Sequence, residues 1–148
     1  DLAWELPDRV AIDVDVDDPM DHALLDPVRV REVRAVMSRH VGVVRDEMSL
    51  SSAAGALGSI GRAMRSAKPT GASGDDVVQP VEPSRRSWEG TNVLTVAMAV
   101  VAAARARTES RGCHRRSDFP VPLDAWLCHL DVTLDRSGTI DVSGPDDV

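Results

Sequence analysis

Apolar residues recur in steps of three and four along two stretches of the first half of the chain, which is the spacing of one helix face. The first stripe consists of Val30, Val33, Met37, Val41, Val44 and Met48. The second stripe consists of Leu50, Ala54, Leu57, Ile60 and Met64. Asp26 and Pro27 precede the first stripe as an N-cap acceptor and a proline at the first helical position. We therefore expect helices over residues 27–47 and 50–65.

A third helix is predicted over residues 88–111. It contains a run from Val93 to Ala104 that is apolar except for Thr95, so apolar side chains occur on every face. Such a helix suits the centre of a bundle, where Val100 is expected to be buried. Ser87 is the expected N-cap, and Gly112 is expected at C′, just beyond the helix end. The run is shorter than the roughly 18–20 residues that a membrane span needs.

The other segments predict connections and one β-hairpin. Residues 1–26 hold nine acids and one basic residue, which predicts a solvated, extended arm. Proline, glycine and serine between residues 67 and 86 predict a flexible insertion within a helical domain over 27–130. Apolar and polar residues alternate from Leu130 to Val142 around Ser137-Gly138, which predicts a hairpin and tail over 131–148. The fold class expected is thus mainly α, a three-helix bundle with a small C-terminal β-hairpin.

The composition supports helix packing and excludes several classes of protein. Aromatic residues make up only 3% of the 148 residues, with one Phe and no Tyr, which disfavours an aromatic-rich β-sandwich. The net charge of −7 argues against a general nucleic-acid binder, which needs a basic face. Two cysteines are too few for a secreted disulfide scaffold, and we expect no signal peptide, because residues 1–5 lack its basic and apolar regions. A cytoplasmic protein is the simplest expectation.

The richest candidate chemistry lies at the end of the third predicted helix and just beyond it, between Arg105 and Asp118. Its arginines suit a phosphate or a dicarboxylate, but they also suit salt bridges to Glu109 and Asp118 or docking against another domain. Cys113-His114 and Cys128-His129 suggest zinc, yet adjacent residues rarely reach one ion, so we expect free thiols and no metal. A nucleophilic Cys113 lacks an orienting third group in the sequence, so it is also disfavoured.

This segment resembles the pattern R-x-E-S-R-G-x-H-x-R-x-D-[FY]-P of the succinate dehydrogenase/fumarate reductase flavoprotein family. The matching residues are Arg107, Glu109, Ser110, Arg111, Gly112, His114, Arg116, Asp118, Phe119 and Pro120. Two further stretches are similar to family motifs, namely V-G-V-V-R at residues 41–45 and N-V-L-T-V-A at residues 92–97. The resemblance covers about residues 27–130. Within the family, the short tail after the motif is most similar to the L-aspartate oxidase branch.

The resemblance implies the C-terminal helical domain of an FAD enzyme that oxidises L-aspartate to iminoaspartate. FAD and the catalytic residues belong to the flavin-binding and capping domains of that family, and this chain has no G-x-G-x-x-G motif. We therefore expect no catalytic, FAD-binding or metal-binding residue here. A scaffold role is expected, with Glu109, Ser110, Arg111, Gly112, His114, Arg116 and Asp118 docking against the other domains. The alternatives are a dehydrogenase or reductase subunit domain and a free-standing helical interaction module.

Overall fold

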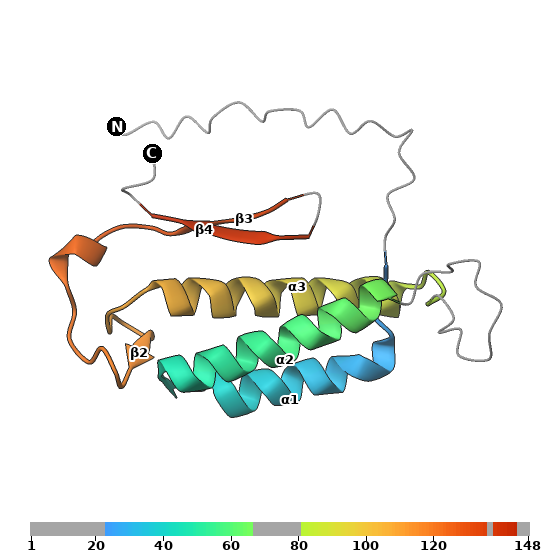
Figure 1. The fold of residues 1–148 in the computed structure, drawn as a ribbon, viewed down its shortest axis with the longest axis horizontal. Coiled ribbons are helices and arrows are strands. Elements are labelled where there is room, and N and C mark those ends of the chain that lie inside the picture. The colour runs from blue at the N-terminus through green and yellow to red at the C-terminus, as the bar shows by residue number, and fades with distance from the viewer. Residues whose placement is uncertain (1–22, 67–80, 136–137, 145–148) are drawn as a thin grey trace, which may run out of the picture.

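The computed structural model describes residues 23–66, 81–135 and 138–144. Three helices pack side by side, and a β-hairpin lies along the third of them (Figure 1). The helices are α1 (Val30–His40), α2 (Glu47–Ser66) and α3 (Arg85–Ala106), and the hairpin is β3 (Asp131–Leu134) with β4 (Ile140–Ser143). The short elements are 3-10 turns η1 (Pro27–Arg29) and η2 (Asp124–Trp126) and strands β1 (Val44–Arg45) and β2 (Arg115–Arg116). The predicted mainly α fold, a three-helix bundle with a small C-terminal hairpin, is confirmed.

The core lies where the three helices face one another. Val33 of α1, Leu57 of α2 and Leu94 of α3 are almost completely removed from solvent. On α2 the predicted stripe is confirmed, because its five residues are buried or pack against the core. Each fully buried aliphatic side chain contributes about 1.5–3 kcal/mol relative to exposure.

The core begins earlier in the chain than the sequence predicted. Leu24 and Leu25 are buried, and the Leu25 amide donates a hydrogen bond to Thr91 Oγ1 on α3 at 2.9 Å. The predicted arm, residues 1–26, therefore extends too far along the chain, because Leu24 and Leu25 are buried and Leu25 belongs to the core. Residues 1–22 of the predicted arm lie outside the described residues. The predicted cap is confirmed, since Asp26 Oδ1 accepts from the Val28 amide and Pro27 opens η1.

The first predicted helix is wrong at its C-terminal end, because α1 stops at His40 rather than near 47. Val44 and Met48 are exposed, so they do not continue the buried stripe of α1. Instead β1 pairs in parallel with β2, and a new helix begins beyond Asp46. The Asp46 carboxylate accepts from the Ser49 amide at 2.7 Å, while Ser49 Oγ accepts from the Asp46 amide at 3.0 Å. This reciprocal cap satisfies free amides at the start of α2.

The third predicted helix is displaced towards the N-terminus. Ser84, not Ser87, is the N-cap, and Ser87 completes the capping box from the third helical position. The helix therefore includes Arg85 and Arg86, which the sequence placed in the insertion. Residues 67–80 of that insertion lie outside the described part of the chain. It ends at Ala106, so Gly112 is not its C′ residue.

Val100 is also placed wrongly by the sequence, because 43% of its surface is exposed. The buried line of α3 runs through Leu94, Ala97, Val101 and Ala104 in steps of three and four, and Val100 lies beside it. The other apolar faces of α3 are covered in part by β4. None of the helices in the described part of the chain has the length and apolar character needed to cross a membrane.

Candidate functional site

The segment with the family-like motif lies at one end of the bundle, where α1 connects to α2 (Figure 1). The chain leaves α3 and reverses at Gly112, whose φ of 56° is a left-handed value that favours glycine. Around it the amide of Arg111 donates to the carbonyl of His114 at 2.8 Å, and the reverse bond measures 2.9 Å. The following strand β2 then pairs with β1, which fixes this segment against the α1–α2 connection.

Glu109 is the centre of the first charged network. Its side chain is 0% exposed, and Oε1 accepts from Arg107 Nη1 at 2.7 Å and from Arg111 Nε at 2.9 Å. Oε2 accepts from Arg111 Nη2 at 3.1 Å and from the Leu123 amide at 2.8 Å. These bonds, that from Arg111 foremost, lower the pKa of Glu109 from 4.5 to about 2 although desolvation opposes them. The carboxylate is thus ionised and has four donors already.

Arg107 joins this network to the chain beyond it. Its Nη1 donates to the carbonyl of Trp126 at 2.9 Å, and its Nη2 donates to the carbonyl of Cys128 at 2.7 Å. The guanidinium also lies over the Trp126 ring, 5.3 Å from the centroid, which is within the range of a cation–π contact. The partly buried side chain of Arg107 therefore holds residues 126–128 against the end of α3.

Arg116 is the centre of the second network and is 2% exposed. Its Nη1 donates to the carbonyls of Ala104 and Arg105, at 3.1 and 3.2 Å, and so caps the last turn of α3. Its other side binds Asp118 through two hydrogen bonds, which lower the pKa of that carboxyl well below its usual range. Asp118 Oδ2 in turn accepts from the Glu47 amide at 2.9 Å, at the first residue of α2. The pair therefore ties the end of α3 to the start of α2.

Ser110 and His114 satisfy backbone groups of the same segment. Ser110 Oγ accepts from the Arg116 amide at 2.8 Å and lies 2.8 Å from the carbonyl of Phe119. His114 Nδ1 lies 3.2 Å from Arg45 Nη1, and because arginine only donates, Nδ1 is the acceptor. His114 Nε2 then carries the proton and donates to the carbonyl of Arg107 at 3.2 Å. Burial first, and then the neighbouring arginine charges, lower the pKa of His114.

The seven predicted site residues lie within ten consecutive positions of the chain, and the structure directs most of their polar groups to the chain's own atoms. The predicted salt bridges of the arginines with Glu109 and Asp118 are present. Arg111 and Asp118 keep 37% and 30% of their side chains exposed, so outward docking by these residues stays a prediction. Sequence reasoning missed the contributions of Arg45 and Glu47. The only signal for Arg45 was its place in the V-G-V-V-R motif, and Glu47 gave none.

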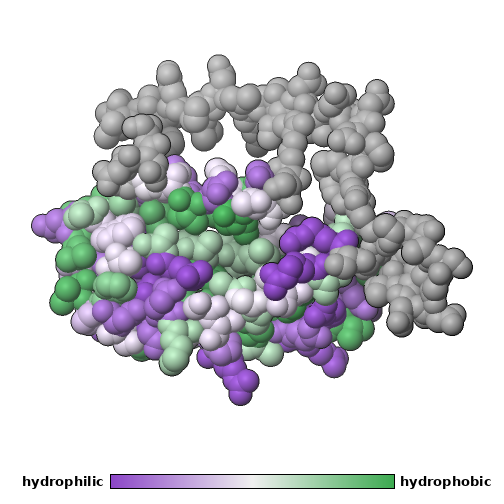
Figure 2. Space-filling model, viewed as in Figure 1, coloured by the Kyte–Doolittle hydropathy of each residue, from purple (hydrophilic) through white to green (hydrophobic). Residues whose placement is uncertain are grey.

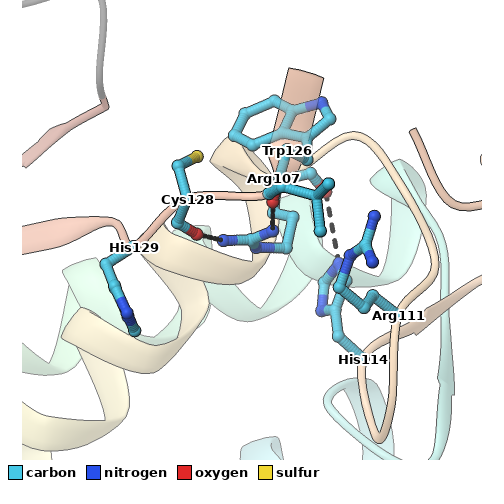
Figure 3. A pocket seen from close by; sticks show the side chains of 7 residues that line it. Arg107, Arg111, His114, Trp126, Cys128 and His129 are labelled. Carbon is cyan, nitrogen blue, oxygen red and sulfur yellow. Dashed lines mark hydrogen bonds between the residues drawn. The ribbon is translucent and has the colours of Figure 1, made fainter. Parts of the chain in front are cut away.

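A hollow of about 340 Å³ opens beside this network (Figure 3). It is lined by Arg107, Arg111, His114, Trp126, Leu127, Cys128 and His129. Both cysteines are free thiols, and Cys113 is exposed outside the hollow. Within the described ranges, no three His, Cys, Asp or Glu side chains gather closely enough to hold a metal ion. Each carboxylate of the motif accepts hydrogen bonds from arginine side chains and from one backbone amide.

Comparison with known proteins gives a family match over most of this chain. Residues 30–143 match the family model described as fumarate reductase flavoprotein C-term. The L-aspartate oxidase of Streptomyces coelicolor is 35% identical over 126 residues, which is 84% of this chain and 21% of that protein. The L-aspartate oxidase of Rhodospirillum rubrum is 35% identical over 64% of this chain and 27% of that protein. The succinate dehydrogenase flavoprotein subunit of Rickettsia felis is 30% identical over 74% of this chain and 18% of that protein.

Proposed function

Because this chain belongs to the fumarate reductase flavoprotein family and matches its C-terminal domain, we propose that it is the C-terminal domain of an FAD-dependent L-aspartate oxidase. In this proposal it supplies no catalytic residue and binds neither FAD nor metal. It packs against the flavin-binding and capping domains of the parent protein and stabilises them. The parent enzyme would act in the cytoplasm and oxidise L-aspartate to iminoaspartate, the first step of bacterial quinolinate and NAD synthesis.

The observation that carries the proposal is the extent of the match. The similarity to the Streptomyces coelicolor L-aspartate oxidase extends over 84% of this chain, yet the chain spans only about a fifth of that protein's length. A Rossmann-like flavin domain needs a βαβ unit with a glycine-rich turn, and the described helices and strands contain no such unit. In this proposal, flavin and substrate bind to the remainder of the parent protein.

The charged groups of residues 107–118 support a structural role. Glu109 has four hydrogen-bond donors, and Asp118 is held by both Arg116 and an amide of α2. A catalytic base needs free lone pairs near its substrate, and the oxygens of Glu109 already accept four hydrogen bonds. Buried networks of this kind instead fix the positions of the elements that they join.

A second candidate is the same domain of a succinate dehydrogenase flavoprotein subunit. The observation in its favour is that three such subunits, from Rickettsia felis, Rickettsia conorii and Coxiella burnetii, are 30–33% identical over 67–76% of this chain. The two candidates share fold, cofactor and scaffold role, and they differ in the substrate of the parent enzyme.

The test is to express the complete reading frame that encodes this chain and to measure oxidation of L-aspartate and of succinate by the purified protein. We expect bound FAD, aspartate-dependent flavin reduction and no succinate-dependent reduction. The 148-residue chain, purified in parallel as the control, should bind no FAD and oxidise neither substrate. Reduction by succinate alone would favour the second candidate. A flavin spectrum in the isolated chain would contradict the scaffold role.

A further inference from the structure

We propose that one end of the bundle, formed by residues 43–48 and 119–127, is the surface on which the flavin-binding part of the parent protein docks. We call this surface the end face. The inference rests on the proposed function and adds to it the location and the chemistry of the interface.

The end face is where large apolar side chains are exposed. In the described part of the chain, thirteen large apolar residues are exposed, and seven of these belong to the two segments of the end face. They are Val43, Val44, Met48, Phe119, Val121, Leu123 and Leu127. Val43, Met48 and Leu127 expose 79%, 77% and 68% of their surfaces. Exposed apolar side chains that gather at one end of a molecule mark an interaction surface more often than scattered ones do.

The two segments form one surface although they are about 70 residues apart in sequence. The pairing of β1 with β2 joins them, and the Ser117 amide donates to the carbonyl of Arg45 at 2.8 Å. Figure 1 places the loop that follows β2 at this end of the bundle, and Figure 2 shows hydrophobic surface at the same end. Apolar side chains from both connections can therefore meet a single partner.

Polar groups of this region are largely satisfied from the inside. Ser110 forms hydrogen bonds with backbone groups of Arg116, Phe119 and Val121. The Leu123 amide donates a hydrogen bond to the Glu109 carboxylate. Pro120 and Pro122 have no backbone N–H group, so no donor of theirs loses a hydrogen bond to water when the surface is covered. Covering residues 119–123 therefore removes apolar side chains from water, while Ser110 and Glu109 keep the partners that they already have.

The hollow beside Trp126 adjoins Leu127 and offers one place where a side chain of the partner can insert (Figure 3). Its walls combine an indole ring, the exposed part of Arg111 and the apolar Leu127 side chain. Tryptophan and arginine dominate the energetic centres of protein interfaces, because each combines a large contact area with directed polar contacts.

The occupant to which we commit is the rest of the parent flavoprotein. This chain matches a C-terminal domain and spans only about a fifth of the Streptomyces coelicolor relative, so most of such a parent is available to cover the end face. A linked domain also has a high effective concentration, which favours it over a second copy in solution.

Amide hydrogen exchange tests the location directly. Amides in residues 43–48 and 119–127 should exchange at least about tenfold more slowly in the complete flavoprotein than in the isolated 148-residue chain, as a stability difference of about 1.4 kcal/mol requires. Amides of η1, at the opposite end of the bundle, should exchange equally in both proteins. Equal exchange of the end-face amides in the two proteins would overturn the inference.

Matched substitutions in the complete flavoprotein test the chemistry. Leu127→Asp and Val121→Asp place a charge on the end face, whereas Val28→Asp places a charge within η1, on a residue that is 74% exposed. The first two should accelerate loss of FAD about tenfold or more, and Val28→Asp should leave it near the parent rate. Equal effects of all three substitutions would overturn the inference.

Sedimentation of the isolated chain tests the competing occupant. A monomer supports docking of the parent's own domains, whereas a dimer that Leu127→Asp dissociates would overturn the inference in favour of a second copy. Failure of the proposed function gives a different result. A complete protein that protects the end face but oxidises neither aspartate nor succinate would support the docking surface and contradict the proposed enzyme activity.

Discussion

Arg116 and Asp118 form a two-pronged ion pair, with Nε to Oδ1 at 2.8 Å and Nη2 to Oδ2 at 2.7 Å. The arginine side chain is 1% exposed and the carboxylate 30%, so one member lies inside the protein and the other at its edge. Their remaining bonds go to carbonyls of α3 and an amide of α2, so the pair connects two helix ends that are far apart in sequence.

Removal of Arg116 should therefore be strongly destabilising. Arg116→Gln leaves Asp118 without its partner and the last carbonyls of α3 without their donor, and we expect a loss of roughly 3 kcal/mol in the free energy of unfolding. Chemical denaturation followed by circular dichroism measures this loss. The neighbouring Arg115 is exposed, so Arg115→Gln is the matched control and should change stability by less than about 0.5 kcal/mol. Equal effects would contradict the network.

Two glycine substitutions should have opposite signs. A Cβ on Gly90 would lie 2.9 Å from Val30 Cγ2, so Gly90→Ala forces α1 and α3 apart, and the stiff valine cannot yield easily. We expect a net loss of about 1–2 kcal/mol, because overpacking outweighs the gain in helix propensity. Gly55 on α2 has nothing within 4 Å of such a Cβ, so Gly55→Ala should stabilise by up to about 1 kcal/mol. Thermal unfolding of both variants checks the pair, and a stabilised Gly90→Ala would show that the helices pack differently.

Adjacent valines on α3 should respond differently to the same charge. Val101 is 2% exposed, so Val101→Asp buries an unpaired carboxylate and should cost several kcal/mol, enough to unfold a marginally stable domain. Val100 is 43% exposed, so Val100→Asp should cost no more than about 1 kcal/mol. Far-UV circular dichroism distinguishes the two outcomes. Loss of helix in Val100→Asp but not in Val101→Asp would reverse the assigned face.

Acid should unfold the domain partly through Glu109. Its pKa is about 2 in the folded protein and 4.5 as the ordinary value, so the unfolded chain takes up its proton first as the pH falls. The stability that this group contributes is complete above about pH 4.5 and is lost as the pH falls from there towards 2. The melting temperature should accordingly fall through this window, with Asp118 adding in the same direction.

Glu109→Gln should be less stable at neutral pH and should show a shallower fall between pH 5 and 2. Glu82→Gln removes the same charge from an exposed residue ahead of α3 and serves as the control, with a pH dependence parallel to that of the unchanged protein. If the curve of Glu109→Gln were also parallel to that of the unchanged protein, folding would not lower the pKa of Glu109.

The sequence alone determined the elements whose causes are local. The α2 stripe, the cap formed by Asp26 and Pro27, and the alternation that forms β3 and β4 each depend on residues within a few positions of one another. Periodic apolar spacing and capping side chains act within a turn or a strand pair, so they could be predicted without the rest of the fold. The motif between residues 107 and 120 was likewise found from residue order alone.

The tertiary structure decided where α1 and α3 end and what the motif does. The α1 stripe continues in sequence through Val44, but β1 leaves the helix to pair with β2 about 70 residues later. The α3 pattern continues past Ala106, but Arg107 donates hydrogen bonds to the carbonyls of Trp126 and Cys128, and Arg116 donates to the last carbonyls of the helix. A buried charge must find partners wherever the fold supplies them, and those partners lie far along the chain, beyond the reach of any local pattern.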